Sequence, residues 1–95
     1  MRQQKSIQAG QIKGLLHIPG VGPSIARDLA SIGIRSVKYL KGKSPERLYD
    51  KSNRAAGVVQ DPCLLYVFRC AVYFASTRRP SPQKLQWWYW KNTTL

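Results

Sequence analysis

Apolar residues recur along the first third of the chain with the spacing of an α-helix, and two turn signals interrupt them. One apolar stripe ends at Pro19-Gly20, and a second begins after Gly22-Pro23. Because residues at i, i+3 and i+4 share one helix face, the pattern predicts a first helix near 9–17 and a second near 23–32. The residues of the two faces are Ile12, Leu15 and Leu16, then Ile25, Ala26, Leu29 and Ile32.

A capping side chain followed directly by proline occurs at three later positions, which are Ser44-Pro45, Asp61-Pro62 and Ser81-Pro82. Such a side chain accepts a hydrogen bond from the first turn of a helix, and proline at the first helical position removes an N–H that has no partner there. We therefore expect helices over 45–56 and 62–77, and one that begins at Pro82. Gly57 is the expected C-cap of the first of these helices.

The segment 62–77 is apolar nearly all the way round, which is typical of a helix in a protein core. Its apolar residues are Leu64, Leu65, Val67, Phe68, Ala71, Val72, Phe74 and Ala75. A shorter helix is predicted between the second helix and Ser44. There Ser36 is a candidate cap, and Val37 and Leu40 form an i, i+3 pair. No stretch favours a strand over these helices.

The chain has 95 residues, of which 43% are hydrophobic, and this is enough for one modest core. We expect an all-α protein with the architecture of a compact five- or six-helix bundle. Its expected parts are a flexible N-terminal tail over 1–8, a domain over 9–79, and a short aromatic helix and tail over 80–95 that packs on the domain.

Basic residues greatly outnumber acidic ones, with 16 Lys and Arg against 4 Asp and Glu, so the net charge is +12. Such an excess favours a polyanionic partner. No apolar run approaches the roughly 20 residues that a bilayer span needs, and no signal-peptide core follows the polar start. We therefore expect a cytoplasmic protein that binds nucleic acid and has no membrane partner.

The two cysteines, Cys63 and Cys70, lie on one predicted helix. Seven residues of helix rise roughly 10 Å, whereas a disulfide needs Cα atoms within about 7 Å of each other. These cysteines cannot pair with each other there. We expect two reduced thiols, buried as small apolar residues.

The connection between the first two helices is the most informative stretch of the sequence. It reads Pro19-Gly20-Val21-Gly22-Pro23, in which glycine allows a tight turn and a close approach of a ligand to the backbone. The N–H groups that enter the following helix have no intrahelical acceptor and lie at the positive end of the helix dipole. A phosphate oxygen is the natural partner of such groups, and we favour this interpretation over that of an ordinary connector between helices.

The stretch from Leu15 to Ala26 has the form Leu-x-x-x-Pro-Gly-Val-Gly-Pro-x-x-Ala and resembles the helix-hairpin-helix motif of DNA-binding proteins that do not read sequence. Residues 20–27 and 33–40 are similar to the hairpin segment of family X DNA polymerases. The whole chain, through the 63–75 helix and the 85–91 aromatic tail, resembles the small bacterial helix-hairpin-helix proteins of the pathogenicity-locus family.

The motif resemblance implies a binding site for DNA phosphates at Gly20, Val21, Gly22, Ser24, Ile25 and Arg27. It also implies a monovalent cation, K⁺ or Na⁺, at the carbonyls of Leu16, Ile18 and Val21. The sequence departs from the motif at Asp28, where a basic residue often stands. Either Arg27 alone supplies the positive charge there, or the surface binds DNA less tightly, so the departure concerns affinity more than fold.

Basic residues around the hairpin are expected to form a supporting rim at Lys13, Arg35, Lys38, Lys41 and Lys43, next to Arg27. Neutralising about three to five phosphates would give a slope of log affinity against log salt near −3 to −4. The predicted partner is duplex, damaged or gapped DNA, bound without base readout. No catalytic role is expected, because Glu46 and Asp50 better suit a helix dipole and neighbouring lysines than a metal.

Two other interpretations remain open. In the first, the hairpin and the aromatic tail Trp87-Trp88-Tyr89-Trp90 dock a protein partner or a second copy of the chain. In the second, a lysine forms a Schiff base with an abasic sugar, as in some lyase domains. The tail itself either stacks on unpaired bases or folds back onto the helices, and we expect the packed arrangement because the core is small.

Overall fold

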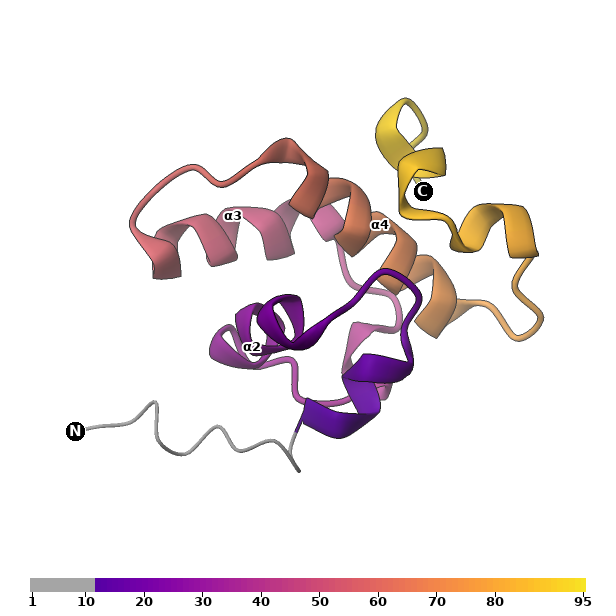
Figure 1. Ribbon diagram of the computed structural model, residues 1–95, viewed down its shortest axis with the longest axis horizontal. Helices are drawn as coiled ribbons and strands as arrows, with labels where there is room; N and C mark the ends of the chain where they lie inside the picture. Colours follow the sequence, from indigo (N-terminus) through magenta and orange to yellow (C-terminus); the bar gives the residue numbers. More distant parts are fainter. Residues whose placement is uncertain (1–11) are drawn as a thin grey trace.

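The computed structural model describes residues 12–95, and these residues form three α-helices joined by short turns (Figure 1). The α-helices are α2 (Pro23–Ser31), α3 (Pro45–Ala56) and α4 (Pro62–Ser76). Four short 3₁₀ helices accompany them, namely η2 (Lys13–His17), η3 (Val37–Leu40), η4 (Pro82–Leu85) and η5 (Trp87–Lys91). No strand occurs in this part of the chain, which confirms the all-α class.

The expected five- or six-helix bundle is wrong for the described residues, because several predicted helices are single turns of 3₁₀ helix. The segments concerned are short and bounded by proline or glycine, so an α-helix cannot propagate through them. The predicted first helix shows the effect. Over 13–17 it is 3₁₀ rather than α, since Gly14 weakens a helix and Pro19 keeps Ile18 extended. Residues 1–11, including the predicted N-terminal tail, lie outside the described residues.

The cap signals correctly place the start of α3 and of α4. The Ser44 hydroxyl accepts a hydrogen bond of 3.3 Å from the Arg47 N–H, and the Asp61 carboxylate accepts one of 2.8 Å from the Cys63 N–H. Gly57 ends α3 in the left-handed conformation, with a φ of 76°, as expected of a C-cap glycine. Local chemistry therefore fixes the bounds of α3 residue by residue.

The same signal fails at Ser36 and Ser81, whose side chains make no cap hydrogen bond. In each 3₁₀ turn, the third N–H already bonds to the backbone carbonyl of the serine, at 3.1 Å for Tyr39 and 3.0 Å for Lys84. In an α-helix, this N–H would donate a hydrogen bond to the side chain of the N-cap residue. The Ser36 hydroxyl is consequently buried without a hydrogen-bond partner.

Helix α4 forms the centre of the core, with α3 packed on one side and the C-terminal tail on another (Figure 1). Phe68, Cys70 and Ala71 are fully buried on it. The helix is not buried all round, because Leu65, Tyr66 and Tyr73 are only half-buried. No helix of the described residues is long and apolar enough to cross a membrane.

The two cysteines are both free, as expected, but only one of them is buried. Cys70 faces the core, and burial raises the pKa of its thiol to about 11. Cys63 is exposed, which makes the predicted burial of this thiol wrong. It lies in the first turn of α4, before the helix enters the core.

Candidate nucleic-acid interface

The turn between η2 and α2 (residues 18–22), called the hairpin below after the predicted motif, is held by backbone hydrogen bonds. The Val21 N–H donates to the Ile18 carbonyl at 3.0 Å, and Gly20 between them has a φ of 86°, which favours glycine. The first hydrogen bond of α2 runs from the Ala26 N–H to the Gly22 carbonyl at 2.9 Å. Pro23 begins the helix and has no N–H to satisfy.

Three amides at the start of α2 have no acceptor among the described residues: those of Gly22, Ser24 and Ile25. Gly22 and Ser24 are exposed and Ile25 is half-buried, so the start of α2 lies at the surface. The Val21 N–H differs from them, because it is bonded within the turn and its side chain is buried. The Ile18 carbonyl, expected to hold a cation, already accepts this bond.

The aromatic tail covers one side of the hairpin. A Cβ built on Gly20 would lie 3.5 Å from Cδ1 of Trp87, which is ordinary van der Waals contact. A Cβ built on Gly22 would meet nothing within 4 Å. Both glycines are exposed, and the space around an added Cβ is open at Gly22 but partly occupied by Trp87 at Gly20.

The side chains expected to form the basic rim are all exposed, and they are Lys13, Arg27, Arg35, Lys38, Lys41 and Lys43. Lys38 Nζ lies 5.4 Å from the centre of the Tyr39 ring. The rim thus gathers exposed positive charge from several segments of the chain.

A basic hollow at the start of α3 extends the rim beyond the residues predicted from the sequence. It has a volume of about 300 Å³ and is lined by Gly42, Lys43, Ser44, Arg47, Leu48 and Lys51. Arg47 and Lys51 lie one turn apart on α3, an i, i+4 pair of like charges that destabilises a helix unless an anion binds there. That spacing is the sequence signal that could have identified these two residues.

The acidic residues lie where they neutralise other arginines. Glu46 pairs with Arg69 at 3.1 Å, and Asp50 pairs with Arg54 at 2.9 Å, rather than with lysines as expected. No group of three or more potential metal-ligating side chains occurs in the part of the chain that the structure describes. Burial raises the pKa of Asp28, the acid beside the hairpin, and the nearby positive charge of Arg27 lowers it in part.

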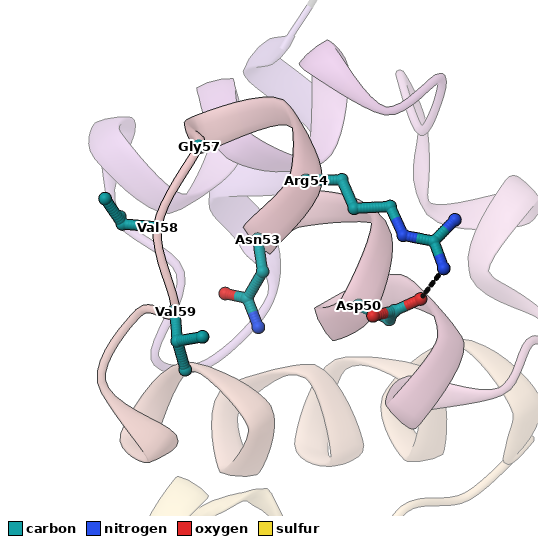
Figure 2. A pocket seen from close by; sticks show the side chains of 6 residues that line it. All are labelled: Asp50, Asn53, Arg54, Gly57, Val58 and Val59. Atoms are coloured by element: carbon teal, nitrogen blue, oxygen red, sulfur yellow. Dashed lines mark ion pairs between the residues drawn. The ribbon is translucent and has the colours of Figure 1, made fainter.

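A second hollow lies away from the hairpin, where α3 ends and the connection to α4 begins (Figure 2). Its volume is about 330 Å³, and it is lined by Asp50, Asn53, Arg54, Gly57, Val58 and Val59. Val58 is 62% exposed and Val59 is 83% exposed. The Asp50–Arg54 ion pair on α3 borders this hollow, as Figure 2 shows. The lining of this hollow combines apolar valines with an arginine that is already paired with an aspartate, unlike the basic rim.

Comparison with known proteins identifies one family. The model of the Cdd1 family, described as pathogenicity locus, matches residues 8–94 and so covers nearly the whole chain. This match confirms the resemblance to pathogenicity-locus proteins, whereas the likeness to polymerase hairpins stays a prediction. No curated protein and no solved structure matches the chain significantly.

Proposed function

The chain belongs to the Cdd1 pathogenicity-locus family, and we propose that it is a DNA-binding module that holds backbone phosphates at the start of α2. In this proposal the segment from η2 to α2 acts as a helix-hairpin-helix motif. The observation that carries it is the set of amides of Gly22, Ser24 and Ile25, which lie at the surface and have no acceptor among residues 12–95. Such amides at a helix N-terminus bind anions.

The charge around the hairpin supports the same ligand. Arg27 follows the unpaired amides on α2, and the exposed lysines of the rim flank them in sequence. The basic hollow adds Arg47 and Lys51 on α3, which packs against α2. A polyanion with evenly spaced charges can contact several of these groups at once, which a single small anion cannot.

The proposed binding does not depend on base sequence. Sequence is read mainly by side chains that reach base edges in the major groove, whereas phosphate contacts set position and affinity. The groups assigned to the site are backbone amides, a hydroxyl and basic side chains, which suit phosphates. We propose no catalytic step for the protein, and in this role it is an accessory module for other DNA-processing proteins.

The proposal is tested by substituting Gly22 with alanine, which places a methyl group where the phosphate is expected to bind. Gly22→Ala adds a Cβ in open space at a backbone φ of −96°, which alanine adopts readily, so the fold should be retained. Gly14→Ala is the matched control, because a Cβ there also meets nothing within 4 Å and it lies in η2 rather than at the start of α2. Binding to a labelled duplex is measured by fluorescence anisotropy.

We expect Gly22→Ala to weaken duplex binding by at least about tenfold, since a methyl group at that position keeps a phosphate away from the amides. Gly14→Ala should bind like the wild-type protein. Circular dichroism verifies that both variants are folded. Equal binding by all three proteins would show that the charge acts diffusely and that the hairpin is only a connector.

The exposed valines at the end of α3 favour a second candidate function, which is docking of a protein partner. Apolar side chains as exposed as Val58 and Val59, next to a hollow, are typical of interaction surfaces. This surface differs from the one predicted from the sequence, where the hairpin and the tail would dock the partner. If a second copy of the chain binds there, the wild-type protein should form dimers by analytical ultracentrifugation and Val59→Asp should be monomeric.

A further inference from the structure

The three tryptophans of the tail lie in three different environments. Trp90 is 3% exposed, and its indole N–H donates to the Lys84 carbonyl at 2.9 Å. Trp87 is half-buried against Gly20 of the hairpin. Trp88, between them, is 56% exposed. The core therefore accounts for Trp90 and Trp87 but leaves Trp88 without a structural role of its own.

The neighbours of Trp88 hold it at a fixed place beside the hairpin. Its ring lies edge-on to the Trp87 ring, with 5.7 Å between the centroids, and Trp87 in turn lies beside Gly20, where an added Cβ would be 3.5 Å from its ring. On the other side, Arg69 of α4 donates to the backbone carbonyl of Trp90 at 2.8 Å. The short η5 segment is thus anchored at both ends, so the exposed indole loses little conformational entropy when it binds a ligand.

We propose that Trp88 stacks on an unpaired nucleobase of the DNA strand whose phosphates the hairpin holds. This inference rests on the proposed function and names its substrate class, which is DNA with unpaired bases. An indole presents a broad π-face, and aromatic side chains next to a basic groove are the usual platform for unpaired bases. The net charge of +12 makes a polyanion that carries flat apolar groups the best match for this surface.

The arrangement favours unpaired bases over paired ones. In a continuous duplex each base is already stacked on two neighbours, so an external indole gains little. A base in a single strand, a gap or an overhang has a free face, and the backbone beside it still carries the phosphates that the amides of α2 require. Stacking tolerates any base, in agreement with a module that does not read sequence.

The test uses two labelled single strands of equal length and charge. One is oligothymidine, whose bases stack weakly on each other, and the other carries abasic sugars at every position. Both present the same phosphates, so the difference in their affinities isolates the contribution of the bases. The proteins compared are the wild type, Trp88→Ala, Trp88→Phe and Gly22→Ala.

We expect the wild-type protein to bind oligothymidine about 5- to 150-fold more tightly than the abasic strand, the range for stacking of one base. Trp88→Ala should remove this preference and leave the affinity for the abasic strand unchanged. Trp88→Phe should retain part of the preference, because phenylalanine keeps a π-face. Gly22→Ala should weaken the binding of both strands by a similar factor.

The outcomes separate this inference from the proposed function. If the wild-type protein binds both strands equally well, or if Trp88→Ala weakens both alike, phosphate binding stands and stacking by Trp88 is wrong. If neither single strand binds to the wild-type protein but the labelled duplex does, the proposed function stands and the stacking role is wrong; if the duplex also fails to bind, both fail. Because Trp88 is exposed, its variants should keep the wild-type melting temperature, which thermal unfolding checks.

Discussion

At the scale of single residues, Gly20 and Gly22 of the hairpin have different roles, although both are expected to bind phosphate in the predicted motif. Gly20 has a positive φ and lies against Trp87, so it serves the turn and the packing of the tail. Gly22 has an ordinary φ and open space around it, so it serves access to the helix start. The sequence predicts that both are needed. It cannot distinguish them, because Trp87 comes from a distant part of the chain.

Asp28 is the residue whose charge opposes the proposed ligand, and Asp28→Asn should strengthen duplex binding several-fold at neutral pH. The carboxylate is next to Arg27 and repels a phosphate at the start of α2. Binding by fluorescence anisotropy at low salt measures the gain, which should shrink as salt is added. A variant that binds no more tightly than the wild type would place the phosphates elsewhere.

The same substitution has a predicted pH dependence. Burial raises the pKa of Asp28 in the folded protein, so the folded state favours the protonated carboxyl. The stability that this gives is present below the ordinary pKa of aspartate, about 3.9, and is lost as the pH rises through the folded pKa. Asp28→Asn should therefore gain stability relative to wild type as the pH goes from acid to neutral. Urea unfolding at an acidic pH and at neutral pH measures the free energies of both proteins. A difference between variant and wild type that does not change with pH would contradict the prediction.

At the scale of helices, the serine caps provide a matched pair. Ser44 and Ser81 both precede proline, but only the Ser44 hydroxyl accepts a hydrogen bond from its helix. Ser44→Ala should lower the free energy of unfolding by about 1 kcal/mol, because an N-cap of α3 is lost. Ser81→Ala should change it by less than about 0.5 kcal/mol. Urea unfolding, monitored by circular dichroism, compares the free energies of unfolding of the two variants. If Ser44→Ala lowers this free energy no more than Ser81→Ala does, the cap hydrogen bond on α3 does not stabilise the protein.

The helices that the sequence predicts well are those with local signals at both ends. Helix α3 begins at Pro45 and ends before Gly57, as predicted, because a cap and a left-handed glycine fix its bounds. The choice between an α-helix and a 3₁₀ turn at Val37 or Pro82 could not be predicted. Both segments follow a serine, as α3 does, and Ser81 is also followed by proline, yet both form 3₁₀ turns of four residues rather than α-helices.

At the scale of the whole molecule, the tail packs on the core through Trp90, which is buried, and through Trp87, which is partly buried. Trp90 packs against Tyr73 of α4, with 5.4 Å between the ring centroids, and is nearly fully buried. Trp90→Ala should cost about 3–5 kcal/mol, the usual loss for a large buried aromatic side chain. Thermal unfolding, with Trp88→Ala as the exposed control, measures the difference. Similar melting temperatures for the two variants would mean that the tail does not stabilise the fold.

The sequence predicts the components of the candidate site but not how they are combined. The hairpin, the excess of basic charge and the aromatic tail are all evident in it. The contact of Trp87 with Gly20 and the hollow that gathers Lys43, Arg47 and Lys51 arise from tertiary packing. Periodicity and motifs report on neighbours along the chain, and so they could not show which of the three tryptophans stays exposed.

The central claim, that the start of α2 holds DNA phosphates, is tested most directly by the salt dependence of duplex binding. Arg27→Gln is compared with Lys91→Gln, which removes the same charge at the end of η5, near Cys63 of α4. For the wild-type protein we predict a slope of log affinity against log salt of about −3 to −4. Arg27→Gln should make the slope about 1 unit shallower, and Lys91→Gln should leave it unchanged. Equal changes in both variants, or no duplex binding at physiological salt, would contradict the claim.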